Sequence, residues 1–455
     1  MDFTSKKRCQ LKFFSRRVDT EKNLVYNISM KNRAYARERR NDMKKLFGNA
    51  VVGQSGGPTA AINATLAGVI RGVKENVHNG CINTLYGMRN GVEGLLEERL
   101  VDLTEYFEND ELITKLENTP AAALGSCRKK LPKPGEGEEV YEKLLSIFKK
   151  YDIRYFFYIG GNDSMDTVAK LSEYSKSHDY EMRIIGVPKT IDNDLVVTDH
   201  TPGFGSAAKY IATTMQEIIR DCAVYTTKAV TIVEIMGRDA GWLTASAAIG
   251  RIVNGIAPDL VYLPERNFDL KEFFEDVRAA LEKHPNVVIA VSEGIHFADG
   301  TYVCEGVGVG GTDVFGHKQL SGTGKALEIA VKNEIGCKVR SVELNICQRC
   351  ASHIGSKTDI DESVRVGRGA VKAASEGVTR EMITIERVSS APYKTEIGHS
   401  DVSKIANLIK SVYPEFINER GNDVTDACCE YLLPLIIGEN TPAYINGMPD
   451  YIVIE

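Results

Sequence analysis

Short apolar segments alternate with longer amphipathic segments along most of the chain beyond residue 47. The apolar segments are rich in β-branched and aromatic residues and lie at 50–52, 155–159, 184–187, 229–235 and 287–291. Segments with apolar positions at helical spacing lie at 58–75, 165–175, 204–221, 270–283 and 323–334. Apolar strands that alternate with helices are typical of a parallel sheet covered on both faces. The pattern therefore predicts a doubly wound α/β protein.

The length and composition add a domain count to this picture. A chain of 455 residues exceeds one ordinary domain, so we expect two core-forming units. The composition is that of a globular protein, with 43% hydrophobic and 26% charged residues. No apolar run reaches the roughly 18 residues that cross a bilayer, so we expect no membrane partner.

The charge is divided unevenly between the start of the chain and the rest. Residues 1–47 carry 14 Lys and Arg against 5 Asp and Glu, a balance of +9 that leaves −15 of the total of −6 for the remainder. An acidic body does not favour nucleic-acid binding. The basic start lacks an apolar secretory segment, so we expect a cytoplasmic protein. We expect 1–47 to be a poorly packed extension with a helical segment near 31–46, unless the functional chain begins at Met43.

Glycines, carboxylates and cations follow the apolar strands directly. They lie at 56–57, 160–164, 189–194, 236–238 and 292–294. Doubly wound folds bind ligands outside the carboxyl ends of their strands, so these segments should gather at one edge. Their composition suits an anionic substrate that is handled with a metal ion.

Two of these loops have the composition of phosphate sites. Gly56 and Gly161 each lie between an apolar strand and a helical segment. Glycine amides and a helix N-terminus both attract anions. The residues after Gly161 add oxygen atoms that could hold Mg²⁺ against phosphate; they are Asn162, Asp163 and Ser164. A tight turn at Gly56, and simple capping of the helix by one of these three residues, are the alternatives.

The loop at 189–194 carries the densest chemistry. Lys189, Asp192 and Asp194 follow an apolar strand within six residues. One carboxylate could accept a hydroxyl proton while the other orients it, and the cation could neutralise a phosphoryl group in transfer. Arg238 suits a phosphate, and Glu293 could bind sugar hydroxyls. The alternatives are a solvated polar turn, a surface ion pair and an ordinary loop acid.

Taken together, these segments resemble the phosphofructokinase A family. Gly-Gly-Asn-Asp-Ser at 160–164 is followed by Pro-Lys-Thr-Ile-Asp-Asn-Asp at 188–194 and by Met-Gly-Arg-Asp-Ala-Gly at 236–241. The resemblance runs in order over most of residues 48–390. It implies two Rossmann-like lobes with the active site between them. The implied reaction is phosphoryl transfer to the 1-hydroxyl of fructose 6-phosphate.

The resemblance also implies roles for individual residues. Asp192 corresponds to the base, Asp194 to its supporting carboxylate, and Lys189 and Arg238 to the cations beside the transferring group. The implied sugar-phosphate set also contains Thr190, Met236, Gly237, Glu293, Arg340 and Arg349. The implied donor set is Gly56, Arg128, Gly161, Asp163, Ser164 and Lys189.

Asp163 bears on the identity of the phosphoryl donor. Family members that use ATP usually have glycine at this position, whereas members that use pyrophosphate usually have aspartate. A carboxylate there would occupy and repel the α-phosphate of a nucleotide. Lys189 is also typical of the pyrophosphate-dependent members. The resemblance therefore implies a reversible reaction in glycolysis and gluconeogenesis that uses pyrophosphate and gives phosphate.

The chain departs from the family pattern at the implied metal site. Asn162 stands where the family usually has an aspartate that binds Mg²⁺. An amide oxygen can coordinate the ion but adds no negative charge, so we expect Mg²⁺ to be held by Asp163 and Asn162 together with pyrophosphate. The first helical segment offers only Arg71 where regulated members carry several basic residues. We therefore expect no allosteric control.

The resemblance suggests a division of the chain as well. We expect 48–203 with about 350–390 to form the donor lobe, and 204–349 with about 391–455 to form the sugar-phosphate lobe. The family is oligomeric, so we expect a homodimer or homotetramer. The alternatives are an ATP-dependent phosphofructokinase and a non-catalytic regulatory subunit that binds sugar phosphate. Acceptance of seven-carbon sugar phosphates also stays open.

Overall fold

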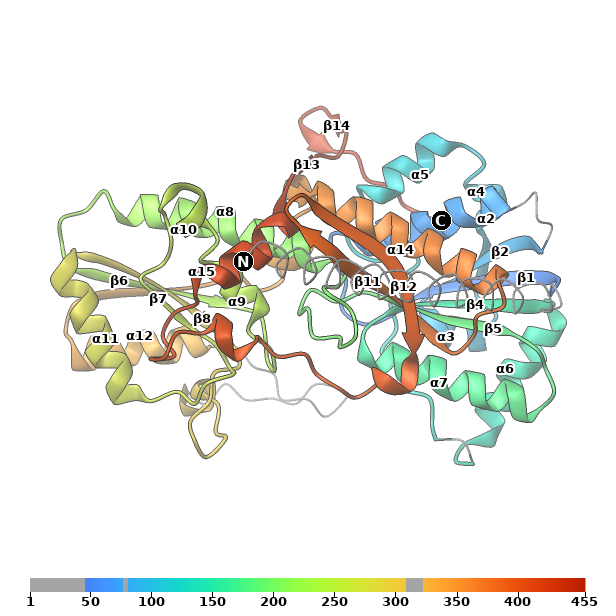
Figure 1. Ribbon diagram of the computed structural model, residues 1–455, viewed down its shortest axis with the longest axis horizontal. Helices are drawn as coiled ribbons and strands as arrows, with labels where there is room; N and C mark the ends of the chain where they lie inside the picture. Colours follow the sequence, from blue (N-terminus) through green and yellow to red (C-terminus); the bar gives the residue numbers. More distant parts are fainter. Residues whose placement is uncertain (1–45, 77–80, 134, 308–321, 455) are drawn as a thin grey trace, which may run out of the picture.

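The computed structural model describes residues 46–76, 81–133, 135–307 and 322–454. The helical segment expected near 31–46 and nearly all of the basic extension lie outside these residues. The described chain forms two lobes side by side, each built on its own sheet (Figure 1). In the described segments, every helix is too short or too polar to traverse a lipid bilayer.

The first lobe is built on a seven-stranded sheet. Its order is β12 (Tyr393–Asp401), β11 (Glu381–Ser390), β5 (Arg183–Pro188), β4 (Ile153–Gly160), β1 (Gly48–Gln54), β2 (Ile82–Met88) and β3 (Leu100–Asp102). The strands from β11 to β2 are parallel, and the two edge strands are antiparallel to their neighbours. β1, β4 and β5 correspond to apolar segments of the sequence, because both of their faces are covered.

Helices cover both faces of this sheet. Helices α2 (Ile62–Asn76) and α14 (Lys357–Ser375) pack on one face with α4 (Leu103–Tyr106) and α5 (Asp110–Glu117) nearby. The other face carries α3 (Gly91–Leu96), α6 (Glu138–Lys150) and α7 (Asn162–Ser177). α2 and α14 approach closely at two glycines. A Cβ at Gly68 would lie 2.3 Å from the Val364 carbonyl oxygen, and one at Gly367 would lie 2.2 Å from that of Thr65.

The second lobe is built on a four-stranded parallel sheet. Its order is β7 (Leu260–Tyr262), β8 (Asn286–Ser292), β6 (Ala229–Ile235) and β9 (Lys338–Glu343). One face packs against α8 (Phe204–Cys222), α9 (Trp242–Ser246), α10 (Gly250–Asn254) and α15 (Asp426–Leu432). The other face carries α11 (Leu270–Lys283) and α12 (Thr323–Glu334). The prediction of two doubly wound α/β lobes is confirmed.

The remaining elements are short. The α-helix α13 spans Cys347–Cys350, and the 3-10 helices span Val303–Val307, Ser352–Ile354, Val402–Lys404, Pro414–Phe416 and Leu433–Ile436. The short strands are β10 (Gly355–Ser356), β13 (Glu439–Asn440), β14 (Tyr444–Ile445) and β15 (Met448–Pro449). β10 pairs with β13, and β14 pairs with β15 in a small hairpin.

The end of the chain divides between the lobes differently from the division suggested by the sequence. We expected about 391–455 in the second lobe, but β12 joins the first sheet because it forms an antiparallel hairpin with β11. Residues 412–435 then pack in the second lobe. The chain finally returns to the first lobe, where Ile452 and Ile454 enter its core and Arg89 donates to the Ile454 carbonyl oxygen at 2.6 Å.

Candidate active site

A cleft of about 440 Å³ lies between the lobes at the carboxyl ends of the strands. Residues that follow β1, β4 and β5 line the first-lobe side, and residues that follow β6 and β8 line the opposite side. The candidate residues that line this cleft are Gly56, Arg128, Gly161, Asn162, Asp163, Ser164, Lys189, Thr190, Asp192, Asp194, Met236, Arg238, Glu293 and Arg349. The strand-end loops therefore gather at one place, as the sequence indicated.

The loop after β1 takes a conformation that requires glycine. Gly56 has a φ of 76°, in the left-handed region, and its amide donates to the Cys127 carbonyl oxygen at 3.0 Å. A Cβ at this position would lie 3.3 Å from the Lys189 Nζ. Arg128 follows the residue that accepts this bond. Gly56 thus lets the loop backbone lie close to the Lys189 ammonium group and to the segment that carries Arg128.

The loop after β4 does not use its side chains to cap the helix. Gly161 is the N-cap of α7, and in the described structure no side chain bonds to the free amides there. Asn162 donates from Nδ2 to the Leu408 carbonyl oxygen at 3.1 Å, while its Oδ1 is buried without a hydrogen-bond partner among the described residues. Ser164 donates to the Ser55 hydroxyl at 3.0 Å. The capping alternative is therefore wrong, and an amide oxygen is left over.

Asp163 lies at the exposed side of this loop. Its side chain is 58% exposed, and its Oδ1 lies 3.0 Å from the Lys130 Nζ. The carboxylate stands in the cleft lining together with Gly161 and Arg128. A bulky anion that entered along the N-terminus of α7 would meet this negative charge.

The loop after β5 places a buried cation beside two buried carboxylates. Lys189 is 3% exposed and donates to the Gly57 carbonyl oxygen at 2.6 Å. Burial lowers the pKa of Lys189 to about 8, although Asp192 and Asp194 oppose this shift. Burial also raises the pKa of Asp192, and burial with the charge of Asp192 raises the pKa of Asp194 to about 7. The Asp192 amide donates to the Thr190 hydroxyl oxygen at 3.1 Å, which folds the loop back on itself.

The second lobe contributes the facing wall. The Gly237 amide donates to Glu293 Oε1 at 3.3 Å, and the Met236 amide donates to the Gln348 side-chain oxygen at 3.2 Å. Gly237 has a φ of 138°, where a Cβ would lie 2.6 Å from the Ala240 carbonyl oxygen. Burial raises the pKa of Glu293 to about 7. Gly237 therefore connects the cleft-lining residues Met236 and Arg238 in the chain, and its amide binds the buried carboxyl group of Glu293.

The two arginines at the end of the implied sugar-phosphate set, Arg340 and Arg349, lie in different places. Arg349, on α13, reaches across the cleft, since a Cβ on Gly57 would lie 3.6 Å from its Nη1. Arg340 lies on β9 and lines a separate cavity of about 100 Å³ with Tyr225 and Lys338. Within the described chain Arg340 is therefore not part of the cleft.

Some cleft residues were not found by sequence reasoning. Cys127, Asp239 and Ile409 also line the cleft. Asp239 directly follows the Met-Gly-Arg segment, so its position was a usable signal. Ile409 lies far along the chain in a segment without charge or glycine clustering, and nothing in the local pattern points to it.

A profile of the phosphofructokinase family matches residues 49–374 of the chain. The chain belongs to the phosphofructokinase family. The matched residues include the loops after β1, β4, β5, β6 and β8, so all of the cleft lining except Ile409 lies within the matched region. The family prediction from the ordered motifs is confirmed.

Relatives within the phosphofructokinase family cover nearly the whole chain. The chain is 42% identical over 403 residues to the pyrophosphate–fructose 6-phosphate 1-phosphotransferase of Halomonas elongata, covering 88% of this chain and 94% of the relative. It is 43% identical over 411 residues to the enzyme of the same name from Xanthomonas campestris, covering 90% and 96%. The solved pyrophosphate-dependent phosphofructokinase of Nitrosospira multiformis superposes with a TM-score of 0.80 at 39% identity, covering 89% and 96%.

Proposed function

We propose that this chain transfers a phosphoryl group from pyrophosphate to the 1-hydroxyl of fructose 6-phosphate. The products are fructose 1,6-bisphosphate and phosphate, and the reaction runs in both directions in glycolysis and gluconeogenesis. The observation that carries the proposal is the pair of Asp163 and Lys189 at the donor side of the cleft. The names of the relatives that cover nearly the whole chain support the same donor and acceptor.

In this proposal the acid loop handles the acceptor. Asp192 takes the proton of the sugar 1-hydroxyl as the hydroxyl oxygen attacks phosphorus. Asp194 is the supporting carboxylate in the same loop. Lys189 and Arg238 stabilise the charge that spreads over the transferring group. The leaving group is inorganic phosphate, which accepts a proton from solvent. Thr190 supports this arrangement through its bond to the Asp192 amide.

The donor side would bind pyrophosphate with backbone amides and cations. Gly56 and Gly161 lie just before α2 and α7, and Arg128 supplies a positive charge in the same cleft. Ser164 is bonded to Ser55 and so ties the two loops together. Asp163 would exclude the α-phosphate of a nucleotide by occupying its place with a negative charge.

Mg²⁺ belongs to the same proposal. The Asn162 Oδ1 atom is buried and lacks a hydrogen-bond partner among the described residues, so it can act as a ligand. Asp163 adds one carboxylate, and in the described parts of the chain no group of three or more metal-ligating side chains surrounds them. Mg²⁺ is commonly held by one or two carboxylates and substrate phosphates, so these residues fit the ion. When bound, the ion would neutralise the pyrophosphate oxygens.

The sugar phosphate would lie against the second lobe. Glu293, Met236 and Gly237 provide a wall for the fructose hydroxyls, and Arg349 provides a cation for the 6-phosphate. Arg340 faces away from this cleft, so the proposal assigns it to the site of a neighbouring subunit in a homodimer or homotetramer. Both substrates are charged metabolites of the cell interior, which places the proposed enzyme in the cytoplasm.

The proposal is tested with a coupled assay that supplies either pyrophosphate or ATP with fructose 6-phosphate. Turnover with pyrophosphate alone is the expected result. The Asp163→Gly variant should gain turnover with ATP, since the excluding charge is removed. Asp166→Gly is the matched control, because it also places glycine in the first turns of α7 but lies outside the cleft lining. Turnover with ATP alone in the wild type would refute the proposed donor. Activity with neither donor, and stimulation of a separate enzyme, would favour the regulatory alternative.

A further inference from the structure

A segment that joins the lobes runs behind the acid loop. After the 3-10 helix Val402–Lys404, the chain leaves the first lobe and reaches the second lobe at Val412. On the way, the Leu408 carbonyl oxygen accepts from Asn162, Ile409 lines the cleft, and the Val412 amide donates to Glu265 at 2.8 Å. The segment therefore contacts the donor loop, the cleft and the second lobe in five residues.

Lys410 is the charged residue of this segment. Its side chain is 8% exposed, and its Nζ donates to the Asn193 Oδ1 at 3.1 Å and to the carbonyl oxygens of Thr198 and Asp199 at 3.2 and 2.8 Å. Its backbone amide donates to the Asp194 carbonyl oxygen at 2.8 Å. Burying an ammonium group is costly unless such partners compensate it, so a role in holding the loop would explain its presence.

Asn193 is the target of this lysine and separates the two carboxylates. It is fully buried, with a φ of 54° in the left-handed region that asparagine tolerates better than most residues. The bond from the Lys410 Nζ holds the Asn193 Oδ1 atom, while the Nδ2 atom has no hydrogen-bond partner among the described residues. A rotation at Asn193 would move Asp192 and Asp194 together.

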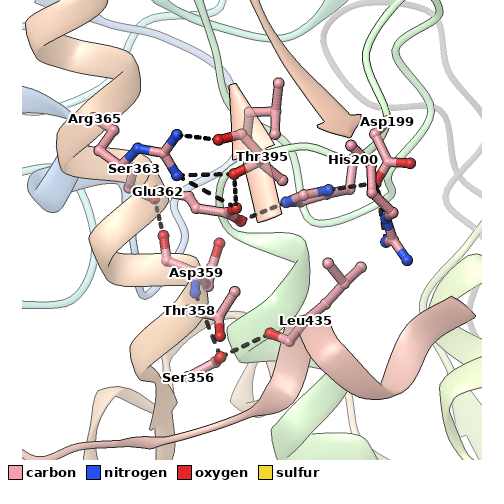
Figure 2. A network of polar contacts seen from close by, with 12 residues as sticks. Asp199, His200, Ser356, Thr358, Asp359, Glu362, Ser363, Arg365, Thr395 and Leu435 are labelled. Atoms are coloured by element: carbon pink, nitrogen blue, oxygen red, sulfur yellow. Dashed lines mark hydrogen bonds and ion pairs between the residues drawn. The ribbon is translucent and has the colours of Figure 1, made fainter. Parts of the chain in front are cut away.

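The lysine is itself held by a rigid neighbourhood. Trp242 of the second lobe donates to the Lys410 carbonyl oxygen at 2.9 Å, and its ring lies 5.5 Å from the Nζ. Behind Asp199, His200 bridges two carboxylates, at 2.7 Å to Asp199 and 2.6 Å to Glu362 of α14 (Figure 2). Arg387 of β11 also pairs with Asp199 at 3.0 Å. Elements of both lobes therefore fix the position of the Lys410 side chain.

We propose that Lys410 is a positioning residue for phosphoryl transfer, which holds Asn193 and thereby sets the orientation of Asp192 and Asp194. The inference rests on the proposed function, since it assigns the acid loop to the acceptor hydroxyl. Lys410 does not line the cleft and so acts through the loop rather than on a substrate. A misplacement of a reacting group by about 1 Å can cost about 10²-fold in rate.

Charge reinforces this geometry near neutral pH. Burial lowers the pKa of Lys410 to about 7, against the charges of Asp199 and Asp194 and with that of Arg387. The ammonium form in turn lowers the pKa of Asp194, which burial and Asp192 raise. Other charged groups also act on Asp192; they are Lys189, Arg238, Asp239 and, across the cleft, Glu293. Loss of the ammonium group should therefore make Asp194 harder to ionise.

The test compares Lys410→Met with Lys209→Met in the pyrophosphate assay. Lys209 is also 8% exposed and also donates to backbone carbonyl oxygens, at 2.7 Å to Gly438 and 3.4 Å to Gly355, but it lies outside the cleft lining. For Lys410→Met we expect kcat to fall by about 10²-fold while the KM for fructose 6-phosphate stays within about threefold. We also expect the acidic limb of its kcat/KM profile to move to higher pH. Lys209→Met should leave both the kcat and the limb in place.

A second variant keeps the test decisive if Lys410→Met folds poorly. Asn193→Gly removes the acceptor of the lysine while glycine accepts the positive φ. Because Lys410→Met and Asn193→Gly remove the same hydrogen bond, their effects on kcat should be markedly less than additive in a double-mutant cycle. Equal losses in the two lysine variants, an unmoved acidic limb, or additive effects would overturn the inference. An inactive wild-type chain would instead refute the proposed function.

Discussion

Substitution of Lys189 by methionine should make the protein more stable and much less active. The ammonium group is 3% exposed, and burial lowers its pKa from 10.5 to about 8. At pH 7 the lysine is protonated in both the folded and the unfolded chain, so the folded state bears the full cost of burying the charge. A difference of about 2.5 in pKa corresponds to roughly 3 kcal/mol. Methionine has a similar length and removes this cost.

Part of that gain is lost with the hydrogen bond from Lys189 to the Gly57 carbonyl oxygen. A hydrogen bond from a charged donor contributes about 1.5–3 kcal/mol, which leaves a net stabilisation of at most about 1.5 kcal/mol. The pH dependence of the free energy of unfolding gives an independent test of the burial cost. Between the folded pKa of about 8 and the ordinary lysine pKa of 10.5 the unfolded chain binds more protons, so wild-type stability rises with pH there. The variant should lack this rise.

The effect on activity has the opposite direction. In the proposed reaction, Lys189 stabilises the charge on the transferring group, and loss of one such donor typically costs about 10²- to 10³-fold in kcat. Asp192 also loses a neighbouring cation that lowers its pKa. The acidic limb of the rate profile should therefore move to higher pH as well.

Two measurements on the same preparation check this prediction. Chemical denaturation at pH 7 and at pH 10 gives the free energy of unfolding, and the pyrophosphate assay gives kcat. The matched control is Lys170→Met, whose lysine lies in α7 and pairs with Asp166 away from the cleft. A variant that is less stable than the wild type at pH 7 would refute the burial argument. A kcat within about threefold of the wild type would refute the proposed role of the cation.

Three further predictions follow from the site and the core. Asp192→Asn should lower kcat by about 10³-fold with little change in the KM for fructose 6-phosphate, since it removes the proton acceptor; steady-state kinetics would contradict this if the loss stayed below tenfold. The pKa of Asp194 is raised to about 7, so the folded chain binds more protons than the unfolded chain between about pH 4 and 7. Stability should fall over that range as pH rises while activity rises. Asp194→Asn should reduce this slope in denaturation curves, although the raised pKa values of Asp192 and Glu293 keep part of it; an unchanged slope would contradict the assignment. Gly367→Ala should reduce the free energy of unfolding by roughly 1–3 kcal/mol, because its Cβ would lie 2.2 Å from the Thr65 carbonyl oxygen. Gly355→Ala is the control for thermal unfolding, since Gly355 has a φ of −57° and its Cβ would meet no atom closer than 3.4 Å; equal midpoints would refute the packing argument.

The sequence predicted five strands that are buried on both faces. It missed β7, which is buried but only three residues long, and it missed the more polar strands. β1, β4, β5, β6 and β8 are nearly continuous apolar runs, because helices cover both of their sides. β12 carries polar and charged side chains along most of its length and lies at a sheet edge, where several of them are exposed to solvent. β9 is similarly polar. Such strands carry no strong apolar signal, so their place in a sheet depends on partners far along the chain.

The candidate site was predictable where its residues follow strands in short motifs. Asp192 and Asp194, for example, lie next to Lys189 in the sequence and in the cleft. Lys410 and Ile409 reach the same place from more than 200 residues away. Their positions depend on how a connecting segment crosses between two finished lobes. Local spacing does not encode such a crossing.

The return of the chain end to the first lobe has a consequence for synthesis. The first sheet lacks β11 and β12 until residue 401 has been made, and its core lacks Ile452 and Ile454 until residue 454 has been made. The first lobe therefore cannot finish folding while the ribosome is still building the second. Removal of only the last few residues should expose apolar core surface in the oldest part of the molecule. In this fold, the core around β1 and α2 is therefore completed only when residues near 450 pack against it.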